Sequence, residues 1–207
     1  AKSWFMDGSI NAAHGSVGAF MILPLLDAHT LTGEQKYADC ALKAFAFYYG
    51  EFAKNGFTTA GALDSYCIDK ESAAPLLRSA LECYHLTRDR AYVDAAEEVA
   101  YYLATWQWHY SVCFPEDSMA KKIGYDTYGG TSVSAAHNAQ DPYGLYYVPE
   151  YLELAQLTGK DIWLKRARAL WYNGIQLISD GTLVIHNRVR PVGSQDESVR
   201  HTRWGRP

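Results

Sequence analysis

The sequence repeats one short stretch three times, as LTGEQKY at residues 31–37, LTRDRAY at 86–92 and LTGKDIW at 157–163. In each copy an aromatic residue stands five positions after the threonine, and an alanine follows four positions later (Ala41, Ala96 and Ala167). An apolar segment with helical period enters each copy, and another leaves it. This pattern is typical of a helix–turn–helix hairpin, so the fold is predicted to be an all-α array of three helical hairpins.

The helices are predicted at about residues 18–30 and 34–52, 71–86 and 89–109, and 142–157 and 161–178. Pro24 lies inside the first of them, so that helix either restarts with proline in its first turn or is kinked. The residues Thr32 to Gln35 match a capping box for the second helix. Aromatic residues at helical spacing, Trp163 and Trp171 among them, are predicted to lie in the core. Near the C-terminus, Asp180-Gly181 between apolar stretches predicts a short β-hairpin.

Composition indicates one folded unit, residues 1–207, because 48% of the residues are hydrophobic and 20% are charged. The net charge of −4 gives no global attraction to nucleic acid or to an anionic membrane. The longest apolar run, residues 19–26, is much shorter than the ~20 residues that span a bilayer. A soluble protein is expected. No signal-peptide pattern follows Ala1, so the choice between cytoplasm and periplasm stays open.

The long connections between the hairpins, here called links, are residues 53–69 and 110–140, and residues 1–17 lead into the first hairpin. The repeat spacing, 55 residues from Thr32 to Thr87 and 71 from Thr87 to Thr158, is too uneven for a regular helical repeat. Because the short turns lie at one end of the hairpins, the links are predicted to converge at the other end. Convergent loops on a rigid frame are where a functional site is expected.

The three turns, together with DKESAAPLLRSALECYHLT at 69–87, resemble the (α/α) toroid glycosidases, the six-hairpin superfamily, over about residues 15–178. The resemblance implies alternating inner and outer helices, with a substrate cleft at the N-terminal ends of the inner helices. A closed toroid needs about twice as many hairpins. The chain is therefore expected to be part of a longer chain or to have an open cleft, and a homo-oligomer is also compatible with it.

The resemblance implies a glycoside hydrolase that acts on oligo- or polysaccharide without a cofactor, and such an enzyme needs two carboxyl groups. Asp69 and Glu71 stand just before a predicted inner helix, where the helix dipole favours carboxylates. Asp141 stands before another, although Pro142 after it also suits a helix cap. The catalytic candidates are Asp69, Glu71 and Asp141, and we expect Asp69 or Glu71 to pair with a carboxyl group from another link. The sequence leaves the partner, and the choice between catalysis and helix capping, open.

Candidate substrate-binding residues lie in or beside the links. His14 and His137 end the same tripeptide, Ala-Ala-His, and each is either a site residue or a loop histidine bonded to backbone. Aromatic rings with polar rims suit the faces of sugars. The full set is His14, His137, Lys70, Trp4, Tyr66, Tyr125, Tyr128 and Tyr143. No metal is expected, because no third ligand stands at helical spacing from these histidines.

Two other functions remain open. A sugar epimerase or polysaccharide lyase on the same frame would use His14 and His137 to move protons. A non-catalytic scaffold would bind a protein or a glycan. The sequence lacks GxGxxG, GxxxxGK[ST], HExxH and GxSxG, which argues against the usual nucleotide, zinc-protease and serine-hydrolase sites. The expected partner is a carbohydrate and not nucleic acid or membrane.

Overall fold

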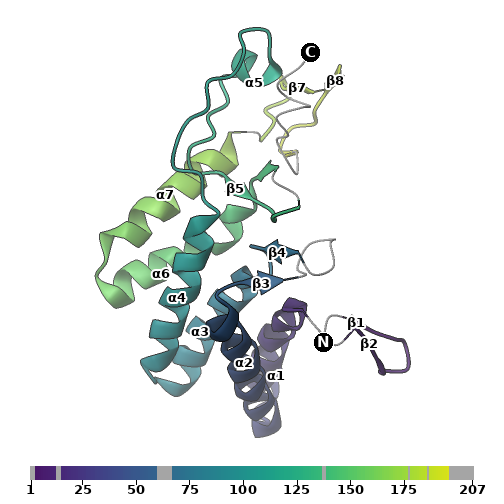
Figure 1. Ribbon diagram of the computed structural model, residues 1–207, viewed down its shortest axis with the longest axis vertical. Coiled ribbons are helices and arrows are strands. Elements are labelled where there is room, and N and C mark those ends of the chain that lie inside the picture. Colours follow the sequence, from purple (N-terminus) through teal and green to yellow (C-terminus); the bar gives the residue numbers. More distant parts are fainter. Residues whose placement is uncertain are drawn as a thin grey trace.

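The computed structural model describes residues 3–12, 15–59, 67–136, 139–176, 178–185 and 187–195. Three helical hairpins stand side by side, as predicted (Figure 1). They are α1 (Ile22–Thr32) with α2 (Gln35–Asn55), α3 (Ala73–Thr87) with α4 (Ala91–Thr105), and α6 (Val148–Thr158) with α7 (Asp161–Ile175). The second hairpin packs between the other two, because α3 contacts α1 on one side and α6 on the other. The helices α1, α3 and α6 are therefore the inner helices.

The repeated threonine ends the first helix of each hairpin in the same way. Its hydroxyl donates to the carbonyl four residues earlier, at 2.7, 2.8 and 2.6 Å for Thr32, Thr87 and Thr158. The same hydroxyl accepts from the backbone N–H two residues later, at 3.2, 3.2 and 3.3 Å. The residue that follows each threonine has a left-handed backbone conformation, with φ of 71°, 63° and 69° at Gly33, Arg88 and Gly159. The capping-box prediction was wrong, because Thr32 caps the end of α1 and makes no side-chain cap for α2.

Two of the inner helices are entered through a turn of 3-10 helix. One is η1 (Val17–Met21) before α1, and the other is η2 (Tyr143–Tyr147) before α6. Pro24 lies in the first turn of α1, so the helix restarts there, which was one of the two predicted alternatives.

Short antiparallel hairpins lie in the links and at both ends of the chain, where the sequence predicted a strand pair only near the C-terminus. They are β1 (Ser3–Trp4) with β2 (Ile10–Ala12), β3 (Thr58–Thr59) with β4 (Ile68–Asp69), β5 (Thr131–Ser132) with β6 (Gln140–Asp141), and β7 (Val184–Ile185) with β8 (Arg188–Val189). The second link also contains α5 (Met119–Lys122). The C-terminal pair turns between Ile185 and Arg188 and not at Asp180-Gly181 as predicted.

The links converge at one end of the hairpins, opposite the short turns, as predicted (Figure 1). Backbone hydrogen bonds join successive links there. Lys70 N–H donates to Val133 at 3.2 Å, and Ala135 N–H donates to Ile68 at 2.9 Å. The first link is tied to the lead-in, since Ser16 N–H donates to Thr59 at 2.9 Å. These bonds tie the irregular segments to one another and satisfy their backbone groups.

The core lies between the helices, and the repeated alanines Ala41, Ala96 and Ala167 are buried in it. Small side chains at these positions let the paired helices approach closely. Trp163 is fully buried, as predicted. Trp171 was also expected in the core, but 53% of its surface is exposed, because the described residues place nothing over that face of α7.

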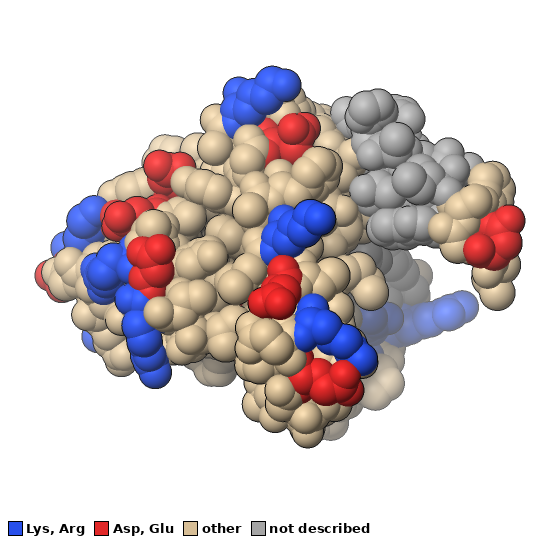
Figure 2. Space-filling model, turned by 90° about the horizontal axis from the view of Figure 1, so that it is seen from below, with Lys and Arg blue, Asp and Glu red and all other residues tan. Residues whose placement is uncertain are grey.

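Charged side chains of both signs are interspersed on the face seen in Figure 2, with no gathering of Lys and Arg. In the described part of the chain, no helix combines the length and apolar character needed to cross a membrane.

The backbone geometry predicts that replacing glycine with alanine has opposite effects on the free energy of unfolding at Gly159 and at Gly50. An added Cβ meets no atom within 4 Å at either Gly159 or Gly50. Gly159 has φ of 69°, so we expect Gly159→Ala to lower the free energy of unfolding by about 1 kcal/mol. Gly50 lies inside α2, where alanine is favoured, so Gly50→Ala is expected to raise it by about 1 kcal/mol. Urea unfolding followed by circular dichroism measures both, and equal effects at the two sites would contradict the turn assignment.

Candidate active site

Two links carry the same threonine–aspartate pair. Thr58 in β3 pairs with Asp69 at the end of β4, and Thr131 in β5 pairs with Asp141 at the end of β6. The Thr58 hydroxyl lies 2.7 Å from the Asp69 carbonyl and 3.2 Å from its carboxylate. The Thr131 hydroxyl lies 2.5 Å from the Asp141 carboxylate. The repeat therefore extends into the links and places each aspartate just before an inner helix.

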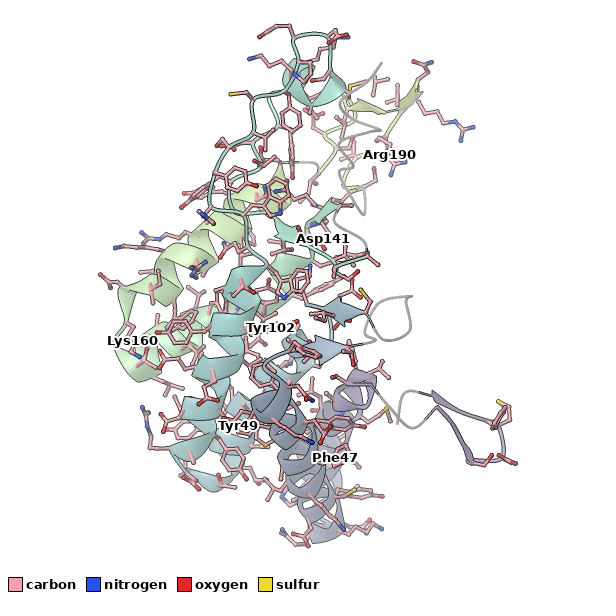
Figure 3. All side chains as sticks on the ribbon, in the orientation of Figure 1. Phe47, Tyr49, Tyr102, Asp141, Lys160 and Arg190 are labelled. Carbon is pink, nitrogen blue, oxygen red and sulfur yellow. The ribbon has the colours of Figure 1, made fainter. Side chains whose placement is uncertain are left out.

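A buried ion pair joins the second hairpin to the third. Lys70 Nζ lies 2.6 Å from both carboxylate oxygens of Asp141 and 2.9 Å from the Thr131 hydroxyl. Asp141 Oδ1 also accepts from the backbone N–H of Tyr143 at 2.9 Å, at the start of η2. Burial lowers the pKa of Lys70, and the Asp141 carboxylate opposes this shift. Figure 3 shows Asp141 among the links, far from Lys160 at the short-turn end.

Beside the ion pair, a pocket of about 340 Å³ opens at the N-terminal ends of the inner helices. All three hairpins contribute to its lining: Phe20, Leu23, Lys70, Glu71, Ala74, Pro75, Arg78, Tyr143, Tyr146, Tyr147 and Glu150. The rings of Tyr143 and Tyr146 are stacked, with centroids 5.4 Å apart. Lys70 Nζ lies 5.7 Å from the centre of the Tyr143 ring. An apolar wall with a few charged groups is typical of a small-molecule site.

Glu150 is a buried carboxyl group of this pocket. Its side chain extends from the first turn of α6, and 7% of the residue surface is exposed. Arg78 Nε lies 3.7 Å from Glu150 Oε1, while Oε2 has no hydrogen-bond partner among the described residues. Burial raises the pKa of Glu150 above its ordinary value of 4.5, and Arg78 opposes the shift. A carboxyl group in this state is suited to hold and donate a proton.

Of the three predicted catalytic acids, Glu71 borders the pocket. Asp141 lies next to it, but its carboxylate is buried and bonded to Lys70, Thr131 and Tyr143. Asp69 is fully buried, and its carbonyl also accepts a hydrogen bond from the Tyr102 hydroxyl at 2.5 Å. The structure thus brings Glu71 and Asp141 to one place and holds Asp69 within the ladder of β3 and β4.

The predicted substrate-binding residues divide into three groups. Lys70 and Tyr143 line the pocket. Tyr125 and Tyr128 do not. Tyr125 is buried and donates to Gln140 at 2.6 Å, and Tyr128 is half exposed elsewhere on the link. The side chain of Trp4 and the residues His14, Tyr66 and His137 lie outside the described part of the chain, so they stay predictions. Within the described part, no three His, Cys, Asp or Glu residues are grouped so as to hold a metal ion.

Sequence reasoning missed Glu150, Arg78, Tyr146 and Tyr147. Arg78 and Glu150 stand inside helical segments, where a charged residue is typical of the solvent face. The run Tyr143 to Tyr147 offered a signal, since three tyrosines follow a predicted helix cap. Their shared pocket depends on how α3 and α6 pack, which the repeat alone does not specify.

Comparison with known proteins was made at the level of sequence and of structure. No protein-family model matches the chain, and no curated protein does. Among solved structures, the selenomethionine form of a family 76 glycoside hydrolase α-mannanase from Bacteroides thetaiotaomicron matches with a TM-score of 0.55 and 16% identity. The match covers 84% of this chain and 48% of that one. The chain is an array of helical hairpins with the fold of part of an (α/α) toroid.

Two further structures match this chain. A family 76 mannosidase from the same organism has a TM-score of 0.54 and 15% identity, over 81% of this chain and 45% of that one. A cellobiose 2-epimerase from Spirochaeta thermophila has a TM-score of 0.40 and 13% identity, over 97% and 66%. The chain spans about half the length of the two family 76 structures.

The buried ion pair predicts strong coupling between its members. Lys70→Met leaves the Asp141 carboxylate buried without its counter-charge, so we expect a loss of about 3–5 kcal/mol in the free energy of unfolding. Adding Asp141→Asn removes that charge and keeps an acceptor for the Tyr143 N–H. The double variant is therefore expected to be more stable than Lys70→Met alone. A double-mutant cycle from urea unfolding measures the coupling, and additive losses would refute it.

The environment of Glu150 predicts a pH-dependent effect of its removal. Because the folded state raises the pKa of Glu150, the stability that its protonated form contributes is complete below about pH 4.5 and is lost as the pH rises through the folded-state pKa. Glu150→Gln stays neutral throughout. We therefore expect the stability of this variant, relative to that of the wild type, to increase as the pH rises from 4 to 7. Thermal unfolding across this range measures the difference, with the exposed Glu116→Gln as a control that should show no such trend.

Proposed function

We propose that the pocket at the inner-helix N-termini is a carbohydrate site, and that the chain carries the acid/base groups of a glycoside hydrolase acting on oligo- or polysaccharide. The observation that carries this proposal is the meeting of two carboxyl groups, Glu71 and Glu150, in one pocket walled by tyrosines. Glycoside hydrolysis needs such a pair, one protonated and one ionised. The family 76 structures with this fold are described as an α-mannanase and a mannosidase, which supports the same class.

The two carboxyl groups have environments that suit different roles. Glu150 is buried, its pKa is raised, and it is the proposed general acid that protonates the leaving glycosidic oxygen. Glu71 is partly exposed and precedes the first turn of α3, where the helix dipole favours the ionised form. In the proposal it takes the proton of the attacking water or attacks the anomeric carbon itself. In either case one water is consumed for each glycosidic bond broken.

The remaining groups of the pocket position a sugar. The stacked rings of Tyr143 and Tyr146 offer an apolar surface for the C–H face of a pyranose. Arg78 has more than half of its side-chain surface exposed beside Glu150, where its guanidinium can donate to sugar hydroxyls. Lys70 is committed to Asp141, so its proposed part is to hold η2 and its tyrosines in place rather than to touch the substrate.

The test is mass spectrometry of products after the protein is incubated with a panel of oligosaccharides. Hydrolysis adds one water to the products. Glu150→Gln and Glu71→Gln are each expected to lower the rate about 100- to 10,000-fold while leaving the circular dichroism spectrum unchanged. Glu116→Gln removes an exposed carboxylate near the start of the second link that does not line the pocket, so it is the matched control and should keep full activity.

Other products would point to the other expected functions. Cleavage without added water would indicate a lyase, and an isomer of unchanged mass would indicate an epimerase. In both cases His14→Ala and His137→Ala should cause the larger loss. Full hydrolysis by both Glu71→Gln and Glu150→Gln would refute the assignment of the pocket. No turnover by the folded protein would favour a scaffold that binds a glycan or a protein.

A further inference from the structure

A second depression, here called the outer groove, lies where the second hairpin leads into the second link. It has a volume of about 300 Å³ and is lined by residues 105–110, which include the last residue of α4, and by residues of the second link between Ser132 and Ala135. It shares no lining residue with the pocket of the candidate active site. Three of its lining residues are aromatic and stand at alternate positions, namely Trp106, Trp108 and Tyr110.

The backbone that carries these rings is extended and not helical. A helix was predicted to about residue 109, but α4 ends at Thr105. The residues that follow pair with the chain that leads into β5, which runs beside them (Figure 1). Trp108 N–H donates to the Gly130 carbonyl at 2.8 Å, and Gly129 N–H donates to the Trp108 carbonyl at 2.8 Å. Side chains at alternate positions of an extended segment lie on the same side, so the rings are brought together there.

The rings are held in place by contacts within the chain. The Trp108 indole N–H donates to the Ser132 hydroxyl at 2.8 Å, and the Trp106 ring meets the Tyr102 ring nearly edge-on, with centroids 6.1 Å apart. The centroids of Trp108 and Tyr110 are 5.3 Å apart, with their planes inclined by 30°. Tyr110 is 53% exposed. A ligand that stacks on rings already fixed in this way has little side-chain ordering to impose, which favours binding.

The polar groups of the outer groove suit an uncharged ligand. Its lining residues in the described chain include no Asp, Glu, Lys or Arg, whereas the pocket contains charges of both signs. The groove instead offers hydroxyls, the amide of Gln107 and the imidazole of His109. A phosphate, a nucleic acid or a charged peptide would lose its hydration there without gaining a counter-charge. A neutral sugar unit has an apolar C–H face for the rings and hydroxyls for the polar rim.

We propose that the outer groove is a second carbohydrate-binding site, which takes uncharged sugar units of a glycan. The class of ligand rests in part on the proposed function, while the place of the site rests on the groove itself. The strand β5 connects the two sites. Its Thr131 hydroxyl contacts Lys70 and Asp141 beside the pocket, and its Ser132 hydroxyl holds Trp108 in the groove. A glycan bound in the groove is therefore kept near the pocket, which raises its effective concentration there.

The binding test is affinity electrophoresis of the whole 207-residue chain in native gels that contain α-mannan, arabinoxylan or hydroxyethyl cellulose. Glu150→Gln serves as the parent, so that the polysaccharide is not degraded. At least one polysaccharide should retard the parent. Tyr110→Ala and Trp108→Ala should each raise the dissociation constant at least about 10-fold, because each removes a stacking face. The matched controls Tyr172→Ala and Trp171→Ala remove exposed rings of α7 that line neither site, so they should bind as the parent does. Circular dichroism verifies folding, and Trp108→Phe replaces Trp108→Ala if the latter does not fold.

Kinetics distinguish the outer groove from the pocket. With Glu150 restored, Tyr110→Ala should raise the KM for a polysaccharide about 10-fold more than the KM for a disaccharide, since only the longer chain reaches both sites. A protein that does not hydrolyse these sugars but is retarded through Tyr110 would refute the proposed hydrolase and leave the groove assignment standing. No retardation of the parent by any of the three polysaccharides would overturn the groove assignment. Equal retardation of the parent, Tyr110→Ala and Trp108→Ala would also overturn it.

Discussion

The buried contact between Lys70 and Asp141 is the interaction on which the functional end of the molecule depends. A buried ammonium group without a counter-charge is costly, so the second and third hairpins are held in the arrangement that pairs both charges. Asp141 also accepts from the N–H of Tyr143, which fixes where η2 begins. η2 in turn carries Tyr143, Tyr146 and Tyr147 into the pocket. One ion pair therefore links the packing of the hairpins to the shape of the candidate site.

The links show how a repeated frame comes to hold different groups. Thr58 with Asp69 and Thr131 with Asp141 have the same strand pairing and the same hydroxyl contact. The surroundings then diverge, since the Asp69 carbonyl meets Tyr102 while the Asp141 carboxylate meets Lys70. The two links have the same backbone arrangement because it is part of the repeat. Their local chemistry differs because the side chains around each aspartate are not repeated. A fold shared with known glycosidases accordingly says little about which carboxyl groups react.

Local sequence signals predicted the helices and their turns, because hydrophobic period and the threonine turn act over a few residues. The two-residue strands of the links are too short to show a period, so most of them were missed. The contact of Lys70 with Asp141 joins residues 71 positions apart, and no local pattern reveals it. Trp171 was wrongly placed in the core because helical spacing identifies an apolar face without saying what covers it. Glu150 was missed for the converse reason, since its burial depends on neighbours from other elements.

The candidate site is built by all three hairpins and not by the exposed outer faces of the row. The lining of the pocket comes from η1, α1, α3, η2, α6 and the link before α3, all within three hairpins that pack on one another. Burial within this set raises the pKa of Glu150, and Arg78 opposes the shift. Trp171 and Met21 are not among the lining residues. The pocket is therefore formed by contacts within these three hairpins and does not depend on the exposed faces of α7 and η1.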